Sequence, residues 1–133
     1  MEPPVDLKIL LAEDNKINQR LFRFTIGQSG LNCDIANNGL EAFEMFKRNG
    51  YDLIFMDVQM PVCDGIEATQ MIRKYESESK IKNHVFIVAL SASLLVDGKD
   101  ECIEAGMDEY MEKPIKNRIL PALIDKVKSK TFR

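Results

Sequence analysis

The chain has 133 residues, of which 45% are hydrophobic and 29% charged, and its formal net charge is −3. This composition is typical of one globular domain that buries its own core without disulfides or structural metals. The slightly acidic balance argues against a nucleic-acid partner, and no apolar run reaches the roughly 20 residues of a membrane helix. We therefore expect a single domain over residues 1–133, with no nucleic acid bound and no membrane insertion.

The cysteines and the first residues indicate the compartment. Cys33, Cys63 and Cys102 are odd in number and have unrelated spacings, which argues against a disulfide framework or a zinc site. The start Met-Glu-Pro-Pro is acidic and proline-rich, unlike a secretory signal. We expect a reducing, cytoplasmic location.

Short β-type runs alternate with helical segments along the chain. The runs at 7–11, 52–56 and 85–90 are continuously apolar, as expected for strands buried on both faces of a parallel sheet. Strict alternation of strand and helix predicts an α/β fold with right-handed crossovers and a doubly wound sheet. In chain order we predict strands at 7–11, 32–36, 52–56, 85–90 and 108–111, and helices at 15–28, 38–49, 64–75, 97–105 and 119–129.

The first predicted helix has two apolar stripes. Ile17, Leu21 and Phe24 recur at helical spacing, and Phe22 and Ile26 form a second stripe about 160° away. One stripe must face the sheet, so the other is left at least partly exposed. An exposed apolar patch of this kind favours protein docking. We favour Ile17 and Leu21 as the docking pair; the alternative is that both stripes are covered within the domain.

Polar side chains stand at the ends of four predicted strands. Glu13 and Asp14 follow the first strand, Asp57 ends the third, Ser91 follows the fourth and Lys113 follows the fifth. Doubly wound sheets bind ligands at the carboxyl ends of their strands, where the strand order reverses. In a flavodoxin-like sheet of order 2-1-3-4-5, that point lies between the first and third strands, which carry the three carboxylates.

These groups predict phosphoryl chemistry. Three crowded carboxylates repel one another unless a cation neutralises them, and Mg²⁺ fits because it takes oxygen ligands and bridges to phosphate. Asp57 would then attack as a nucleophile and form an aspartyl-phosphate, while Lys113 and Ser91 would each contact a phosphoryl oxygen. Each residue alone has an ordinary explanation, such as a helix cap or an exposed lysine. Their occurrence together at matching strand ends favours a site.

Four segments of the chain resemble the signatures of a response-regulator receiver domain. The resemblance covers about residues 7–127, which we take as the domain core. The segment Glu13–Gln19, together with Met60-Pro61, is most similar to the receivers of hybrid histidine kinases and phosphorelays. The resemblance implies a flavodoxin-like five-stranded parallel sheet with five helices. The segments are Ala-Glu-Asp-Asn, Phe-Met-Asp-Val-Gln-Met-Pro followed by Asp64-Gly65, Ala-Leu-Ser-Ala and Glu-Lys-Pro-Ile.

The resemblance also implies a role for each site residue. Asp57 would be the phosphoacceptor. Glu13 and Asp14 would hold Mg²⁺, which Mn²⁺ can replace, and Gln59 would add its backbone carbonyl. Lys113 would contact the phosphoryl group and precede a cis proline.

The resemblance implies a switch as well. Ser91 would move toward the phosphoryl group and Tyr110 would rotate inward behind it. That movement would remodel a surface formed by the helix at 97–105, the strand at 108–111 and the helix at 119–129, where a downstream effector would bind.

The implied function is a signalling phosphoacceptor that promotes its own phosphorylation and dephosphorylation, and not an enzyme acting on outside substrates. Its partner would be a histidine kinase or a histidine phosphotransfer protein, whose histidine-bearing helix packs against the first helix. The chain would be a stand-alone regulator or the cytosolic part of a larger, membrane-associated hybrid kinase.

Three alternatives compete with this interpretation. A phosphatase of the haloacid-dehalogenase type also uses a strand-end Asp with Mg²⁺, but those enzymes have Asp-x-Asp where this chain has Gln59 as the second residue after the acceptor. A flavin-binding module would need a phosphate loop rich in Ser, Thr and Gly, and Glu13-Asp14 would repel its phosphate. A receiver fold that serves only as a scaffold would differ by the absence of chemistry at Asp57.

Overall fold

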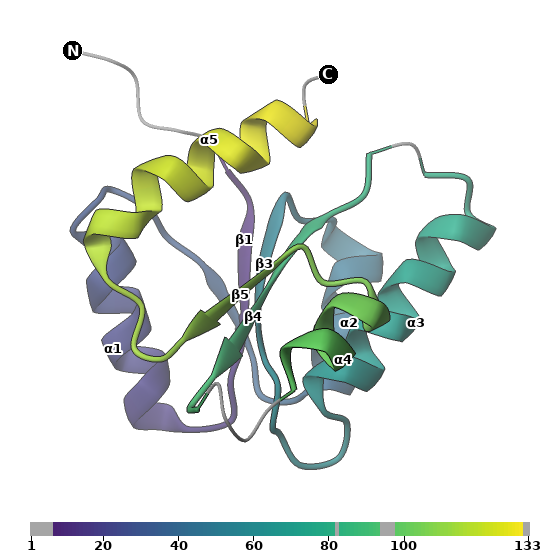
Figure 1. Ribbon diagram of the computed structural model, residues 1–133, viewed down its shortest axis with the longest axis horizontal. Coiled ribbons are helices and arrows are strands. Elements are labelled where there is room, and N and C mark those ends of the chain that lie inside the picture. The colour runs from purple at the N-terminus through teal and green to yellow at the C-terminus, as the bar shows by residue number, and fades with distance from the viewer. Residues whose placement is uncertain (1–6, 82, 94–97, 132–133) are drawn as a thin grey trace.

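The computed structural model describes residues 7–81, 83–93 and 98–131 (Figure 1). Five parallel strands form one sheet in the order β2-β1-β3-β4-β5. The strands are β1 (Ile9–Ala12), β2 (Asp34–Ala36), β3 (Leu53–Asp57), β4 (Phe86–Ser91) and β5 (Glu109–Glu112). The helices are α1 (Lys16–Gly27), α2 (Gly39–Asn49), α3 (Gly65–Glu78), α4 (Lys99–Ala105) and α5 (Leu120–Thr131), the last preceded by a 3-10 turn at Asn117–Ile119. The predicted doubly wound fold and its strand order are confirmed.

The helices cover the sheet in two layers. Figure 1 shows α1 and α5 on one face and α2, α3 and α4 on the other. Alternate residues of each central strand point to opposite faces, so every strand contributes to two apolar clusters. On the α1–α5 face the helices contribute Phe22, Ile26, Leu120, Leu123 and Val127. On the other face they contribute Ala42, Phe46, Ala68, Ile72 and Cys102.

Three helices begin at side-chain caps beside the carboxyl edge of the sheet. Asn15 accepts the backbone N–H of Asn18 at 3.0 Å at the start of α1. Asn38 caps α2 in the same way, and Asp64 caps α3 through the N–H of Glu67 at 2.8 Å. These caps satisfy first-turn donors that have no partner within the helix. They explain why α2 and α3 begin one residue later than the predicted starts at 38 and 64.

One boundary prediction is wrong. We expected the third helix to end at residue 75, but α3 continues to Glu78. The cause is Glu76, whose side chain is fully buried and lies 2.8 Å from the guanidinium of Arg73 one turn earlier. A buried, paired carboxylate belongs to the core, which its charged sequence context conceals.

The fourth helix is short and has unlike ends. Gly98 stands at its N-cap and makes no side-chain cap, whereas Gly106 ends the helix in the left-handed conformation at φ 113°. The predicted end of this helix at residue 105 is confirmed. The predicted start of this helix at residue 97 lies outside the described residues. No helix within the described ranges is long and apolar enough to cross a membrane.

Candidate functional site

The ends of β1 and β3 lie side by side at the carboxyl edge of the sheet. Ala12 pairs with Met56, so Glu13 and Asp57 come next to each other where these neighbouring strands end. Asp57 also pairs with Leu90 of β4, which brings Ser91 to the same edge. Glu13, Asp57 and Ser91, which are far apart in sequence, therefore lie at the same edge of the sheet, as the strand pattern predicts.

Three carboxylates form one cluster at this edge. Oxygen atoms of Glu13, Asp14 and Asp57 all lie within 4.8 Å of one another. Glu13 and Asp57 are buried, with 2% and 4% of their surface exposed, whereas Asp14 is exposed. A group of carboxylates with one side open to solvent is a donor set of the kind that hard divalent cations take.

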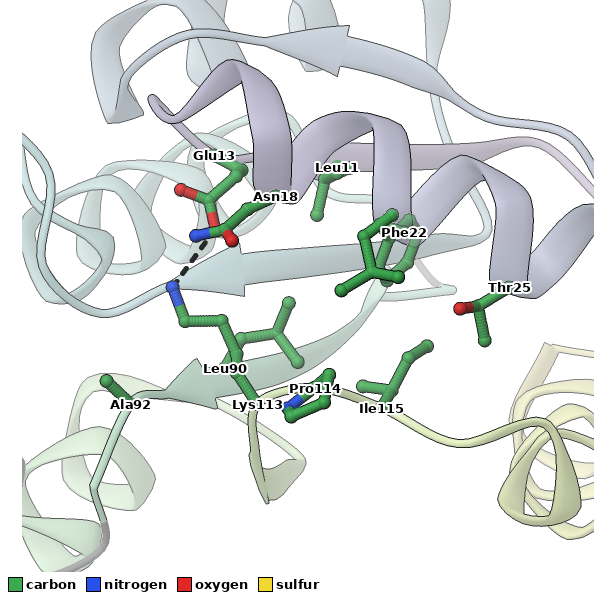
Figure 2. A pocket seen from close by; sticks show the side chains of 11 residues that line it. Leu11, Glu13, Asn18, Phe22, Thr25, Leu90, Ala92, Lys113, Pro114 and Ile115 are labelled. Atoms are coloured by element: carbon green, nitrogen blue, oxygen red, sulfur yellow. Dashed lines mark hydrogen bonds and ion pairs between the residues drawn. The ribbon is translucent and has the colours of Figure 1, made fainter.

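Lys113 reaches this cluster from the end of β5. Its peptide bond to Pro114 is cis, as the resemblance implies. Its ammonium lies 3.0 Å from Oε1 of Glu13 and 3.1 Å from Oδ2 of Asp57. Figure 2 shows the lysine side chain pointing toward Glu13 from the opposite wall of a pocket beside α1. Ion pairs of Lys113 thus connect the ends of β1, β3 and β5.

The protonation equilibria of the three groups reflect this crowding. Burial, reinforced by the negative charge of Glu13, raises the pKa of Asp57 from 3.8 to about 6, against the opposing effect of Lys113. Burial also acts to raise the pKa of Glu13, but hydrogen bonds from Lys113 and the Asn15 N–H outweigh it and the pKa is lowered. Burial acts to lower the pKa of Lys113, yet its two carboxylate partners raise it. The ionised form of Asp57 is therefore disfavoured in this cluster, and a further positive charge beside it would stabilise that form.

The residues expected to contact a metal or a phosphoryl group lie around Asp57. The backbone N–H of Gln59 donates to Oδ1 of Asp57 at 3.2 Å. Ser91 is buried, and its hydroxyl donates to the carbonyl of Ser93 at 2.8 Å. Tyr110 is partly buried and packs against the apolar cluster on the α2–α3–α4 face. The roles of these residues stay predictions.

Two supporting residues were not recognised from the sequence. Gln19 is buried in α1 and donates to the carbonyl of Glu13 at 2.5 Å and to Asn37 at 3.0 Å, which fixes the backbone after β1. Gly65 packs so closely on β3 that a Cβ atom there would lie 2.3 Å from the carbonyl oxygen of Asp57. Both residues belong to segments that resemble the receiver signatures, Gln19 at the end of Glu13–Gln19 and Gly65 in Asp64-Gly65. The sequence pattern does not predict which atoms either residue contacts.

The two stripes of α1 separate as predicted. Phe22 and Ile26 are buried against the sheet, at 6% and 0% exposure. Ile17, Leu21 and Phe24 face outward, at 75%, 47% and 66%. The alternative that the domain covers both stripes is therefore wrong.

A family model described as the response regulator receiver domain matches residues 9–125. The chain belongs to this family. A receiver domain is a signalling module of two-component and phosphorelay systems, so this assignment displaces the phosphatase and flavin-binding alternatives. The scaffold alternative concerns chemistry at Asp57 and stays open.

The receiver is similar to part of a much longer curated protein. It is 43% identical over 119 residues to "Hybrid signal transduction histidine kinase F" of Dictyostelium discoideum. The match covers 90% of this chain and 11% of that protein. The chain therefore spans a small fraction of that relative's length.

Two solved structures resemble the fold closely. One is the receiver domain of the response regulator Ssk1 from Saccharomyces cerevisiae, co-crystallised with the histidine phosphotransfer protein Ypd1, at 34% identity and a TM-score of 0.79, covering 95% of this chain and 89% of that one. The other is the receiver domain of the sensor histidine kinase PA1611 from Pseudomonas aeruginosa, with a magnesium ion in its active-site cleft. It has 32% identity and a TM-score of 0.79, covering 97% of this chain and 100% of that one.

Proposed function

We propose that this receiver domain accepts a phosphoryl group on Asp57 from the phosphohistidine of a histidine kinase or a histidine phosphotransfer protein. The observation that carries the proposal is the cluster of Glu13, Asp14 and Asp57 with the Lys113 ammonium against two of its members. A buried carboxylate held beside an ammonium, with a cation-binding group next to it, is equipped to act as a nucleophile toward phosphorus.

The transfer exchanges one bond to phosphorus for another. A carboxylate oxygen of Asp57 attacks the phosphorus, the phosphorus–nitrogen bond breaks, and its electron pair returns to the imidazole of the donor. Lys113 lies within contact of Asp57 and would stabilise negative charge on a phosphoryl oxygen. Ser91, at the end of the neighbouring strand, would donate its hydroxyl to another. Water attack on the aspartyl-phosphate would later regenerate the free carboxylate and inorganic phosphate.

The donor set fits a divalent cation. Glu13, Asp14 and Asp57 would hold Mg²⁺ or Mn²⁺, directly or through water, and the backbone carbonyl of Gln59 would complete the protein ligands. When bound, the cation would neutralise the carboxylates and polarise a phosphoryl oxygen. The raised pKa of Asp57 supports this assignment, because burial and, after it, the negative charge of Glu13 disfavour the ionised carboxylate despite Lys113. The similar receiver domain of PA1611 was crystallised with a magnesium ion coordinated in its active-site cleft.

Phosphorylation would be read out on the surface of α4, β5 and α5. Phosphate adds roughly two negative charges at Asp57, and Ser91 would turn toward it. Tyr110, partly buried in β5, would move into the space behind Ser91. A downstream effector would then recognise the altered surface. The short α4, with no side-chain cap at its N-terminus, is suited to such a change.

The donor would dock on α1. Ile17 and Leu21 are exposed apolar side chains on the helix that follows Glu13 and Asp14. A partner that covers these two side chains would therefore lie close to the carboxylate cluster that includes Asp57. The receiver domain of Ssk1 forms a complex with Ypd1, which supports a histidine phosphotransfer protein as one class of donor. We keep the cytoplasmic location and the single domain over residues 1–133 as predictions.

Intact mass spectrometry after incubation with acetyl phosphate tests the proposal. We expect a phosphoryl adduct in wild type with Mg²⁺, none with EDTA, and none in Asp57→Asn. Asp125→Asn, which removes an exposed carboxylate of α5, is the matched control and should be labelled like wild type. An adduct that persists in Asp57→Asn would show that another residue is the acceptor. No adduct on folded, Mg²⁺-loaded wild type would favour the scaffold alternative.

A further inference from the structure

A buried side-chain amide holds the backbone between two members of the carboxylate cluster. Glu13 and Asp14 supply two of its three carboxylates, and the peptide that joins them carries the carbonyl oxygen of Glu13. Gln19 donates to this oxygen at 2.5 Å, and only 7% of Gln19 is exposed. Because a peptide unit is planar, fixing its oxygen also fixes the direction in which the chain enters Asp14.

Glu13 is restrained at each of its polar atoms, whereas Asp14 is exposed. The partners of Glu13 come from four segments: the carbonyl of Ala36 for its N–H, Gln19 for its carbonyl, and Lys113 and the Asn15 N–H for its carboxylate. The exposed Asp14 has no such packing around its side chain. Its place in the cluster therefore depends on the peptide that Gln19 holds.

Asn37, in the turn between β2 and α2, orients the amide of Gln19. Its Oδ1 accepts from Nε2 of Gln19 and from the ammonium of Lys16, each at 3.0 Å. Its own side-chain and backbone nitrogens donate to Oε1 of Glu41 at 3.2 and 3.3 Å. Only a donor fits between the carbonyl oxygen of Glu13 and Oδ1 of Asn37, so the nitrogen of the Gln19 amide faces both oxygens.

Gln19 acts on the cluster by position and not by charge. Its amide is neutral, so it does not balance the carboxylates as the ammonium of Lys113 does. Its loss would change where the carboxylates of Glu13 and Asp14 lie and would leave the net charge of the cluster unchanged. Side chains that orient metal ligands in this way typically contribute about 10–100-fold to metal affinity.

We propose that Gln19 and Asn37 are positioning residues for the carboxylate cluster and set its affinity for a divalent cation. The inference rests on the proposed function, in which Glu13, Asp14 and Asp57 hold Mg²⁺. Gln19 holds the Glu13–Asp14 peptide directly, and Asn37 acts through Gln19, whose amide it orients.

Mn²⁺ binding followed by electron paramagnetic resonance tests the inference, because it reports free Mn²⁺ directly and needs no phosphoryl transfer. We expect the Mn²⁺ dissociation constant to rise about tenfold in Gln19→Met, which keeps the length of the side chain and removes its amide, and about threefold in Asn37→Ala. Asn37 is only half-buried, so its truncation is the second variant should Gln19→Met prevent folding.

Each variant has a matched control remote from the cluster. Gln70→Met makes the same replacement at an exposed position of α3. Asn32→Ala removes a side chain that accepts the Cys33 N–H at 2.8 Å, before β2 at the opposite edge of the sheet. Both controls should bind Mn²⁺ within about twofold of wild type, because neither change reaches the ligands.

Two further measurements separate positioning from a purely structural role. A structural role would lower the urea midpoint in EDTA and leave the Mn²⁺ affinity of the folded molecules unchanged. In labelling by acetyl phosphate, the Mg²⁺ concentration at half-maximal rate should rise in Gln19→Met by the same factor as the Mn²⁺ dissociation constant. The rate at saturating Mg²⁺ should return to that of wild type.

The outcomes distinguish this inference from the proposed function. Wild-type Mn²⁺ affinity in Gln19→Met would overturn the inference and leave Asp57 as acceptor. A further loss of affinity when Asn37→Ala is added to Gln19→Met would overturn the action of Asn37 through Gln19. Labelling of Gln19→Met that stays slow at saturating Mg²⁺ would also overturn it, because Gln19 would then act on Asp57 and not on the cation. Absence of Mn²⁺ binding by wild type would instead contradict the cation site of the proposed function.

Discussion

The ammonium of Lys113 lies 3.1 Å from a carboxylate oxygen of Asp57, across 56 residues of sequence. The same ammonium contacts Glu13 at 3.0 Å. One cation therefore holds together two buried carboxylates that would otherwise repel each other. Phosphorylation of Asp57 would offer this ammonium phosphoryl oxygens in place of a carboxylate oxygen, so the lysine would keep a negative partner in both states.

Removing the charge of Asp57 should stabilise the metal-free domain. The pKa of Asp57 is about 6 in the folded protein, above its ordinary 3.8, so the folded state binds the proton more tightly than the unfolded state. Stability conferred by protonation is complete below about pH 4 and is lost as the pH rises through about 6. We expect Asp57→Asn to be more stable than wild type by about 2 kcal/mol above pH 6, and the difference to shrink toward pH 4.

Urea unfolding in EDTA at pH 4.5, 5.5 and 7 measures this difference, and Asp125→Asn serves as the control that leaves the cluster intact. Saturating Mg²⁺ at pH 7 should narrow the gap, because a cation bound only by the folded state stabilises wild type. If the stability difference between Asp57→Asn and wild type stays constant between pH 4.5 and 7, the pKa of Asp57 is not raised in the folded protein.

Gly65 should tolerate no side chain. A Cβ atom there would lie 2.3 Å from the carbonyl oxygen of Asp57, and backbone cannot yield as a flexible side chain does. We expect Gly65→Ala to destabilise the domain by about 2 kcal/mol, as overpacking does, and to slow labelling by acetyl phosphate because Asp57 is displaced. Gly27→Ala is the control, since nothing lies within 4 Å of the position that a Cβ atom would take there. That change should stabilise α1 by about 0.5–1 kcal/mol. Equal effects at the two glycines would contradict close packing at Gly65.

The strand positions and the edge that carries the site could be predicted from the sequence because both depend on local signals, whereas the strand order was an expectation from the flavodoxin-like fold that the resemblance implies. Continuous apolar runs identify buried strands, and the residues that follow them lie at one edge of a parallel sheet. The strand pattern alone places Glu13, Asp57 and Lys113 together in this way. The outward stripe of α1 was predicted by the same kind of periodicity.

What the sequence did not predict depends on contacts between distant segments. Glu76 occurs in a run of charged and polar residues, and only its partners Arg73 and the Val85 N–H explain its burial. The pocket beside α1 is likewise invisible in the sequence, because its walls come from β1, α1, β4 and the segment after β5. Local sequence patterns predict each segment but not the cavity that forms where several segments pack together.

Val62 should be replaceable with a gain in stability. It has a positive φ of 70°, and the N–H of Cys63 closes a tight turn around it by donating to the Pro61 carbonyl at 2.7 Å. A β-branched residue is strained in this region, and 79% of Val62 is exposed, so little packing offsets the strain. We expect Val62→Asn to raise stability by about 1 kcal/mol, because Asn adopts left-handed backbone more readily.

Thermal or urea unfolding measures the effect of Val62→Asn, with Val62→Ala as the comparison. Alanine removes the β-branch but keeps a Cβ atom, so its gain should be smaller than that of asparagine. A loss of stability in both variants would show that the valine side chain makes contacts that outweigh its backbone strain.

The buried pair of Glu76 and Arg73 should stabilise the amino ends of β4 and β5. Glu76 accepts the Val85 N–H at 2.7 Å, while Arg73 donates to the carbonyl of Gly106 at 2.9 Å and to Asp108 at 2.9 Å. Glu76→Ala leaves a partly buried guanidinium and a buried N–H without this partner, so we expect a loss of about 3–5 kcal/mol. Arg73→Met should cost a similar amount, because it leaves the buried carboxylate without its guanidinium partner.

A double-mutant cycle distinguishes this pair from two independent contacts. If the cost comes from the charge left behind, then Arg73→Met combined with Glu76→Ala should be less destabilising than the sum of the two single losses. Urea unfolding at pH 7 gives the free energies, and Glu44→Ala, which removes an exposed partner of Lys47, is the control with an expected loss below about 1 kcal/mol. Additive losses would mean that Arg73 acts through Asp108 and the carbonyls of Val85 and Gly106, and not through Glu76. In that case the pair would contribute nothing to holding α3 against β4.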